Sequence, residues 1–290
     1  MLILQLLING LQVGALYALI AVGFSLIFGS TKIFHFAHGS AFTIAAYVFY
    51  DLYSVVQSHW IVALGGAIFA AVLFGILLDR FVYAPIQRHE GSFFTLFVAS
   101  FGVGIVVQNV IGIIFGRSFV SISTPLSRSI EIASGLFVSP LSGITIICAI
   151  VIFGGLQYFL MRTHVGMALR ALSENPELVR TYGLSPRRLS TIVFALGSLM
   201  VVPAAIISGA SSGLNPAIGH HVMLISLAAT IVGGVGSLRG AACAGLLLGL
   251  AENLALVYFE PQWSEAVTFI VLFLFILFRP SGFFGRAITS

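Results

Sequence analysis

Long apolar runs, separated by short charged or Pro/Gly-rich breaks, follow one another along the whole chain. Nine of these runs are about the length that a helix needs to cross a hydrocarbon core of roughly 30 Å. They cover residues 3–28, 34–54, 61–79, 93–115, 141–160, 190–210, 221–235, 240–258 and 264–278. The pattern predicts an all-α polytopic membrane bundle, with residues 1–290 in a single transmembrane domain.

The seventh run is shorter than the others and leads into the glycine-rich break 233–240. A half-helix or re-entrant segment near 221–240 explains it as well as a full crossing does. Membranes tolerate irregular backbone only where protein or a water-filled cavity surrounds it. The pattern therefore leaves eight and nine full crossings open.

Composition agrees with a membrane bundle. Hydrophobic residues make up 59% of the chain and charged residues 8%, whereas soluble domains carry about a quarter charged residues. Lipid supplies no hydrophobic force between helices, so close packing relies on small residues, and the chain has 31 glycines. Four glycine pairs are spaced to share one helical face: Gly10 with Gly14, Gly112 with Gly116, Gly236 with Gly240 and Gly245 with Gly249.

Basic residues are divided unevenly between the two sets of connectors. With the N-terminus outside, the positive-inside rule places eleven basic residues in the cytoplasm: Lys32, Arg80, Arg88, Arg162, Arg170, Arg180, Arg187, Arg188, Arg239, Arg279 and Arg286. Only Arg117 and Arg128 fall outside, and both tryptophans, Trp60 and Trp263, fall at outer boundaries. The net charge of +4 thus serves orientation, and no basic face interleaved with aromatics suggests nucleic acid.

The connector 161–189 is predicted to fold into two short amphipathic helices on the inner membrane face. Asn175 suits a helix N-cap, and Pro176 suits the first helical position. Gly183 stands where a C-cap belongs, and Ser185-Pro186 repeats the start signal for the next span. A helix pair of this kind is suited to docking with another protein.

Three motifs occur in order along the chain. The first is Gly23-Phe24-Ser25-Leu26-Ile27-Phe28-Gly29, followed by Phe36-Ala37-His38-Gly39. The second, in the connector, is Gly166-Met167-Ala168-Leu169-Arg170-Ala171 with Glu174-Asn175-Pro176 and Gly183-Leu184. The third is Gly233-Gly234-Val235-Gly236-Ser237-Leu238-Arg239-Gly240-Ala241 with Gly249-Leu250-Ala251-Glu252-Asn253. Together they resemble the branched-chain amino acid ABC permeases of the LivH type. One departure is His35, where the family usually has Asn, so the polar contact of that position is not carried over.

The resemblance implies a permease that pairs with a second, related permease, binds two cytoplasmic ATPase subunits and receives substrate from an extracytoplasmic binding protein. It also implies residence in a prokaryotic inner membrane. The residues implied in ATPase docking are Gly166, Leu169, Arg170, Ala171, Glu174, Asn175, Pro176, Gly183 and Leu184.

The chain is not expected to hydrolyse ATP itself. A phosphate-binding loop needs a lysine directly after a Gly-rich turn, and the sole lysine, Lys32, follows no such loop. ATP and Mg²⁺ are therefore expected in the partner ATPases, and no cofactor is expected in this chain. The mechanism predicted is that ATP-driven closure of those partners shifts residues 163–184, and that the fifth and sixth spans carry the shift to a gate.

Polar residues inside the predicted spans are candidates for the substrate route or its gate. An ionised group at mid-bilayer costs about 3 kcal/mol, so Glu252 is expected to face protein or water. Three roles are open for Glu252 and the adjacent Asn253: lining the route, bracing the gate or bonding between helices. Gln108 and Asn109 leave the same choice, and bonding between helices is favoured because amides commonly join helices in lipid. Phe36, His38 and Gly39 of the first motif complete the candidate set, with His38 interpreted as a polar anchor of the second span.

Metal and hydrolase chemistry have weaker support, and no metal or catalytic residue is predicted. His35 and His38 stand three apart without a third ligand nearby, and His220-His221 is interpreted as interfacial. Gly209-Ala210-Ser211-Ser212-Gly213 matches the Gly-x-Ser-x-Gly pattern of serine hydrolases, an alternative of a different class. Its surroundings indicate a membrane exit and not the strand–turn–helix elbow that exposes a nucleophile.

The function predicted is the permease subunit of an ABC importer for branched-chain or related small amino acids. Permeases for urea or short amides look much alike and stay an alternative. An ion-coupled carrier is a further class, but such carriers tend to hold several midplane charges, and Glu252 is the clear one here.

Overall fold

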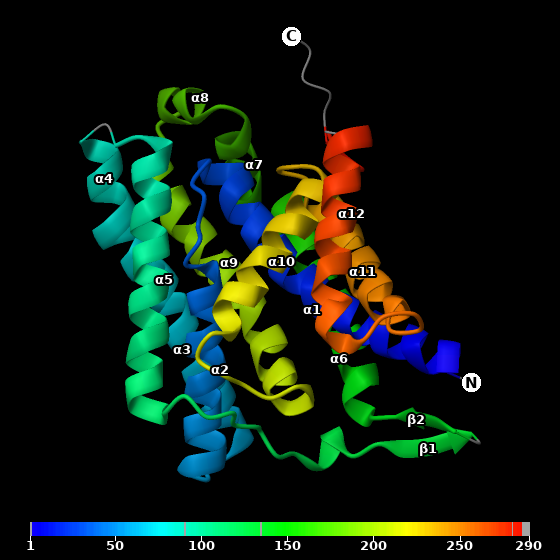
Figure 1. Ribbon diagram of the computed structural model, residues 1–290. Coiled ribbons are helices and arrows are strands. Elements are labelled where there is room, and N and C mark those ends of the chain that lie inside the picture. The colour runs from blue at the N-terminus through cyan, green and yellow to red at the C-terminus, as the bar shows by residue number, and fades with distance from the viewer. Residues whose placement is uncertain (1, 90, 134, 280, 286–290) are drawn as a thin grey trace.

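The computed structural model describes residues 2–89, 91–133, 135–279 and 281–285 (Figure 1). Its helices are α1 (Leu2–Thr31), α2 (His38–Tyr50), α3 (Trp60–Leu78), α4 (Ala84–Arg88), α5 (Phe93–Phe115), α6 (Pro140–Arg162), α7 (His164–Glu174), α8 (Pro176–Thr181), α9 (Pro186–Ser211), α10 (Ile218–Gly233), α11 (Leu238–Ala255) and α12 (Ser264–Phe278). The π-helical turn Asp51–Val55 continues α2, and a second, Asp79–Tyr83, joins α3 to α4. Short 3-10 turns cover Pro125–Ser127 and Pro261–Trp263.

Each predicted apolar run contains a helix, so the all-α polytopic fold class is confirmed. In the described chain, six helical segments are long and apolar enough to cross a membrane: α1, the continuous segment Trp60–Arg88, α5, α6, α9 and α11. The helix α10 and the stretch Ala266–Phe278 are apolar but shorter. The number of full crossings stays a prediction.

A small antiparallel hairpin, β1 (Ile130–Ala133) and β2 (Leu136–Val138), lies in the connector between α5 and α6. The sequence analysis did not predict it, because strands this short carry too little alternation to be distinguished from a loop. The Gln5 side chain of α1 holds the hairpin, since its amide donates to the Phe137 carbonyl and its oxygen accepts from the Phe137 N–H, at 2.8 and 2.9 Å.

Helix α1 runs through the centre of the bundle and crosses α11 at two facing glycine pairs (Figure 1). A Cβ added to Gly14 would lie 2.8 Å from the Leu246 carbonyl oxygen, and one added to Gly245 would meet the Ala18 backbone at 2.5 Å. Gly10 and Gly249 make comparable backbone approaches. The predicted packing role of these two pairs is confirmed, since only glycine leaves room for such contact.

The other two glycine pairs do not share a helical face, and that prediction is wrong. Gly116 ends α5 with φ +81°, and Gly236 lies with φ +83° in the turn before α11. Both adopt the left-handed region that glycine enters without steric cost. Gly240 instead packs against Gly233 and closes the tight turn between α10 and α11.

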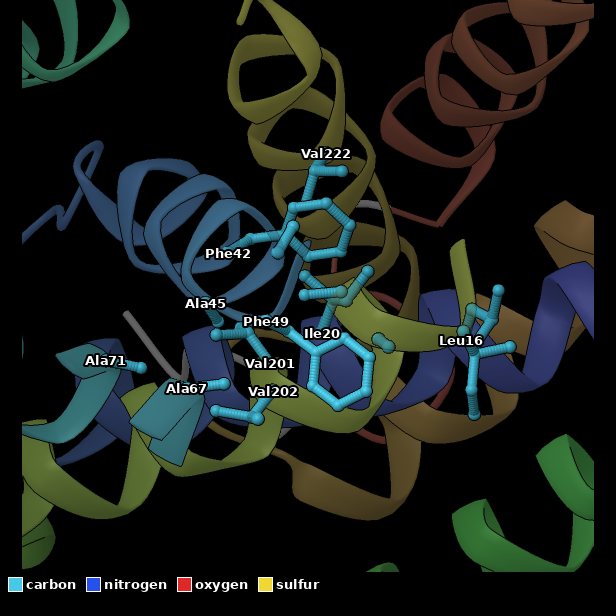
Figure 2. Close-up of a cluster of buried hydrophobic side chains, with 14 of the residues drawn as sticks. Leu16, Ile20, Phe42, Ala45, Phe49, Ala67, Ala71, Val201, Val202 and Val222 are labelled. Atoms are coloured by element: carbon cyan, nitrogen blue, oxygen red, sulfur yellow. The ribbon is translucent and has the colours of Figure 1, made fainter. Parts of the chain in front are cut away.

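The largest apolar core lies where α1, α2, α3 and α9 meet. Ala63, Ala67 and Ala71 recur on one face of α3 with no exposed surface, so α3 approaches α9 closely, while the large side chains of α3 point outward. Figure 2 shows part of this cluster: Leu16, Ile20, Phe42, Ala45, Phe49, Ala67, Ala71, Val201, Val202 and Val222.

Helices α2 and α10 both begin midway along the bundle (Figure 1). The chain leaves α1 at the end that carries α7 and α8 and returns to mid-depth before α2 starts. It leaves α9 at the opposite end and again returns before α10 starts. A short helix near 221–240 was predicted; the corresponding start of α2 was not.

The two ends of the bundle differ in what they carry (Figure 1). One end holds the N-terminal end of α1 and the hairpin, and the other holds α4, α7, α8 and the C-terminal end of α12. The start of α1 and the end of α12 thus lie at opposite ends of the bundle (Figure 1), whereas which end faces the cytoplasm stays a prediction. Arg286, counted among the inner basic residues, lies outside the described residues.

Candidate functional site

The predicted helix pair between α6 and α9 is present as α7 and α8. The Asn175 side-chain oxygen caps α8 by accepting from the Glu177 and Leu178 N–H groups, at 3.0 and 3.1 Å. Gly183 has φ +76° and donates its N–H to the Arg180 carbonyl at 2.9 Å. These local start and stop signals are therefore confirmed.

One face of the helix pair is fixed to the bundle. Leu169, Leu172 and Val179 are almost fully buried in an apolar cluster that includes side chains of α1, α6 and α9. Gly166 packs against the backbone of Leu160, so a side chain there would collide with α6. The helix pair therefore packs directly on the ends of α6 and α9.

The opposite face of the pair is exposed and partly apolar. The exposed large side chains are Val165, Met167, Leu178, Tyr182 and Leu184, with Tyr182 at 77%. Large apolar side chains left exposed on a connector make this face a candidate interaction surface. Arg170 and Glu174 line a neighbouring cavity of about 350 Å³ between α1, α6, α7 and α11. Ala171, Asn175, Pro176 and Gly183 are also exposed.

A second candidate site lies beside α5, whose surface is largely exposed. Gln108 and Asn109 line a recess of about 380 Å³ together with Arg117, Asn215 and Pro216. The Asn109 amide donates to the Ile105 carbonyl of its own helix at 2.8 Å. Gln108 is shared with a much smaller recess deeper in the bundle.

That smaller recess is a constriction of about 10 Å³, roughly the space of one water molecule. Phe36 narrows it, with its ring centroid 4.8 Å from that of Phe101 and 5.8 Å from that of His220. Phe97 lies 6.0 Å from Phe36 on the next turn of α5. Its polar lining residues are Ser40, Thr43, Gln108 and His220.

The first turns of α2 and α10 flank the constriction. Their N-cap residues, Ala37 and Ala217, have no side chain that could accept from the first-turn N–H groups. Both helix starts therefore present the positive end of the helix dipole. Gly39 and Gly219 bring the two backbones into direct contact at this point.

His38 and His35 are wholly buried between helices. The His38 Nε2 atom lies 3.1 Å from the Ile20 carbonyl oxygen of α1, and the His35 Nδ1 atom lies 2.7 Å from the Tyr83 hydroxyl. Among the described residues, no group of three His, Cys, Asp or Glu side chains could hold a metal. His35, which stands where the family usually has Asn, thus makes its own polar contact, with Tyr83.

Glu252 and Asn253 stand apart from the recess, on the part of α11 that crosses α1. The Asn253 amide donates to the Gly249 carbonyl at 3.0 Å, and its Cβ lies 3.2 Å from where Gly10 would carry one. Glu252 is half-buried. The candidates from sequence therefore fall into three groups. Phe36, Gln108 and Asn109 come together beside α5, whereas His38 and Gly39 hold the start of α2. Glu252 and Asn253 lie where α11 crosses α1.

Ser211 ends a helix, with its hydroxyl 3.5 Å from the Ser208 carbonyl and 3.4 Å from the Ser212 hydroxyl. This is not the strand–turn–helix elbow of a serine hydrolase. Ser211 also lines a polar cavity with Gln5, Asn9 and Gln12 of α1.

Arg117 and Asn215 line the larger recess and His220 lines the smaller one, but none of the three was among the candidates from sequence. His220 was interpreted as interfacial, which stays a prediction; the structure places it in the first turn of α10, with its ring against Phe36 and Phe101. The break Leu214-Asn215-Pro216 was the available signal, since Asn-Pro marks a chain turn.

Comparison with known proteins gives consistent results. The family described as "Branched-chain amino acid transport system / permease component" matches residues 6–276. The high-affinity branched-chain amino acid transport system permease protein BraD of Pseudomonas aeruginosa is 29% identical over 296 residues, covering 98% of this chain and 96% of its own. LivH of Escherichia coli, described in the same words, has the same identity and coverage.

A solved structure supports the fold. PsaBC from Streptococcus pneumoniae in complex with Fab aligns with a TM-score of 0.54 at 12% identity, covering 94% of this chain and 91% of that chain. At this identity the likeness concerns the arrangement of helices alone.

Proposed function

The chain belongs to the family of branched-chain amino acid transport system permease components, and from this premise we propose how it works within an importer. Like its relatives, it is a membrane permease component of an ABC transport system. It is not an enzyme. In the proposal it forms the route for branched-chain or related small amino acids together with a second, related permease. Two ATPases drive it from the cytoplasm, and an extracytoplasmic binding protein delivers the substrate.

The observation that carries the proposal is the helix pair α7–α8, which is fixed on one face and exposed on the other. Leu169, Leu172 and Val179 anchor it, and the apolar side chains of its outer face, such as Tyr182 and Leu184, are not covered by the described part of the chain. An ATPase that grips this face would displace the ends of α6 and α9 directly. The docking set is Gly166, Leu169, Arg170, Ala171, Glu174, Asn175, Pro176, Gly183 and Leu184, with the buried members acting as its support.

The substrate route is proposed along the exposed face of α5, where the second permease would complete it. Amides facing lipid would lack hydrogen-bond partners at a cost of several kcal/mol, so Gln108 and Asn109 favour a polar surrounding. A zwitterionic amino acid needs the same surrounding, because its charges lose hydration in hydrocarbon. Arg117 and the positive starts of α2 and α10 suit its carboxylate.

The constriction at Phe36 is proposed as the gate of this route. Its space of about 10 Å³ is far too small for an amino acid, so transport requires Phe36, Phe101 and His220 to separate. His38 and Gly39 would position Phe36 by fixing the start of α2. Glu252 and Asn253 would stabilise the α1–α11 crossing, which would stay fixed while other helices move.

The remaining features of the system follow from this arrangement. ATP and Mg²⁺ would bind to the partner ATPases, and this chain would hold no cofactor. The bundle would lie in a prokaryotic inner membrane as a single permease domain, with the N-terminus outside and α7–α8 in the cytoplasm. The binding protein would select the substrate, so urea or a short amide is a second cargo to test.

The test is reconstitution in proteoliposomes, with and without the subunits that copurify with the tagged full chain. The expected result is uptake of a branched-chain amino acid that needs the ATPases, ATP inside the cytoplasmic compartment and the binding protein. A parallel uptake assay with urea tests whether urea, and not a branched-chain amino acid, is the cargo. Uptake by the chain alone without nucleotide would contradict the proposal.

A further inference from the structure

A large basic cavity, separate from the recess beside α5, opens at the end of the bundle that carries α8. Its volume is about 790 Å³. The walls come from the α1–α2 linker, the end of α4, the starts of α5 and α9, and α8. Four of these segments each contribute one cationic side chain to it: Lys32, Arg88, Arg180 and Arg187.

The positive charge of this cavity is not balanced within the described chain. Its acidic lining residue is Asp79, which is 3% exposed and whose carboxylate accepts from the Ser190 and Thr191 hydroxyls, at 2.8 and 2.5 Å. The ammonium of Lys32 donates to the Gly29 carbonyl at 2.9 Å.

The three arginines have no such partner. Across the residues that the structure describes, the guanidinium groups of Arg88, Arg180 and Arg187 make no hydrogen bond or ion pair. Like charges that converge on one cavity repel each other, so an anion bound between them would relieve that repulsion. The convergence of separate segments also exceeds what membrane orientation requires, since the positive-inside rule needs basic residues on one side but not in one cavity.

Two long helices strengthen the field. Phe93 and Pro186, the first residues of α5 and α9, both line the cavity. The Ser92 and Ser185 side chains cap one N–H group of each helix, and the partial positive charge of a helix start favours phosphate groups.

An apolar surface adjoins the cavity and indicates the source of the phosphate. Phe93 is itself 56% exposed, and its neighbours Phe94 and Phe81 are 69% and 68% exposed. A head group in the cavity would leave its acyl chains beside these rings at membrane depth. We propose that the cavity binds the phosphate group of an anionic phospholipid of the cytoplasmic leaflet, a mode typical of basic pockets between transmembrane helices. This site relies on the proposed orientation and not on the proposed cargo.

Native mass spectrometry of the detergent-purified full chain tests the site. The probes are phosphatidylglycerol, phosphatidylcholine and, separately, inorganic phosphate. The wild type is expected to retain phosphatidylglycerol in preference to phosphatidylcholine. In the double variant R180Q/R187Q, the affinity for phosphatidylglycerol should fall at least about tenfold. The matched control R162Q/R188Q removes the same charge from exposed arginines that do not line the cavity, and it should keep wild-type retention.

Inorganic phosphate separates the two sources of the anion. If millimolar phosphate protects the wild type against heat as well as the lipid does, and R180Q/R187Q loses that protection, the site binds phosphate but the lipid assignment fails. Equal retention of both lipids, or equal losses in the two double variants, would overturn the proposal. Because lipid retention is measured without transport, these outcomes are independent of the proposed cargo and gate.

Discussion

Gly39 and Gly219 meet backbone to backbone where α2 and α10 begin. A Cβ added to Gly39 would overlap the Gly219 carbonyl, and one added to Gly219 would lie 2.6 Å from the Gly39 carbonyl oxygen. This contact joins two helix starts from distant parts of the chain at mid-depth of the bundle (Figure 1). It fixes where Phe36 and His220 stand.

Gly39→Ala should therefore destabilise the protein, by about 1–3 kcal/mol as expected for overpacking, and lower uptake by moving Phe36. Thermal unfolding of the purified chain measures the first effect. Gly65→Ala in α3 is the matched control, because an added Cβ there meets nothing within 4 Å and alanine favours the helix. Equal stability of the two variants would show that the contact at Gly219 is not tight.

Leu169 and Leu178 should separate the two faces of the α7–α8 pair. Leu169 is 1% exposed and Leu178 is 51% exposed. Leu169→Ala should lose about 2–5 kcal/mol of stability, because it leaves a cavity in the core. Leu178→Ala should unfold like the wild type yet copurify less ATPase. The proposed docking face is refuted if Leu178→Ala binds the ATPase at wild-type strength while Leu169→Ala alone reduces binding.

The local order of α7–α8 was predictable because its signals act over one turn. Asn175 accepts from N–H groups two and three residues ahead, so the sequence alone contains both partners. The recess beside α5 was not predictable in the same way. Phe36, Gln108 and His220 come from three distant segments, and nothing in their local patterns states that these segments meet.

Hydropathy also hides where a backbone leaves the helix. The run 34–54 is apolar enough to be predicted as one span despite His35, His38 and Asp51, yet α2 begins only at His38 after an irregular stretch. Gly116 and Gly236 illustrate the same limit, since their four-residue spacing suggested helix packing but both take positive φ outside helices. A spacing rule presupposes a helix, and glycine is also the residue that ends one.

Charge reversal at Arg170 or Glu174 should uncouple ATP hydrolysis from uptake. Both side chains are exposed on α7, so Arg170→Glu and Glu174→Lys should fold normally while opposing the charge that the ATPase presents. The ratio of substrate imported to ATP hydrolysed in proteoliposomes should fall several-fold. Arg128→Glu makes the same reversal at the proposed outer side and should leave that ratio unchanged. Full coupling in both α7 variants would rule out α7 as the docking helix.

Phe36→Ala should open the constriction and allow substrate to leak. The Phe36 ring packs on Phe101 and His220 at centroid separations of 4.8 and 5.8 Å, and its removal would free well over the present 10 Å³. In proteoliposomes of the assembled transporter, amino acid efflux without ATP should rise, while ATP-driven accumulation should fall because the gradient drains. Phe69→Ala, at a side chain of α3 that is 68% exposed, removes the same ring without touching the recess and should show no leak. If both variants are equally tight, Phe36 is a packing residue of α2 and the gate lies elsewhere along α5.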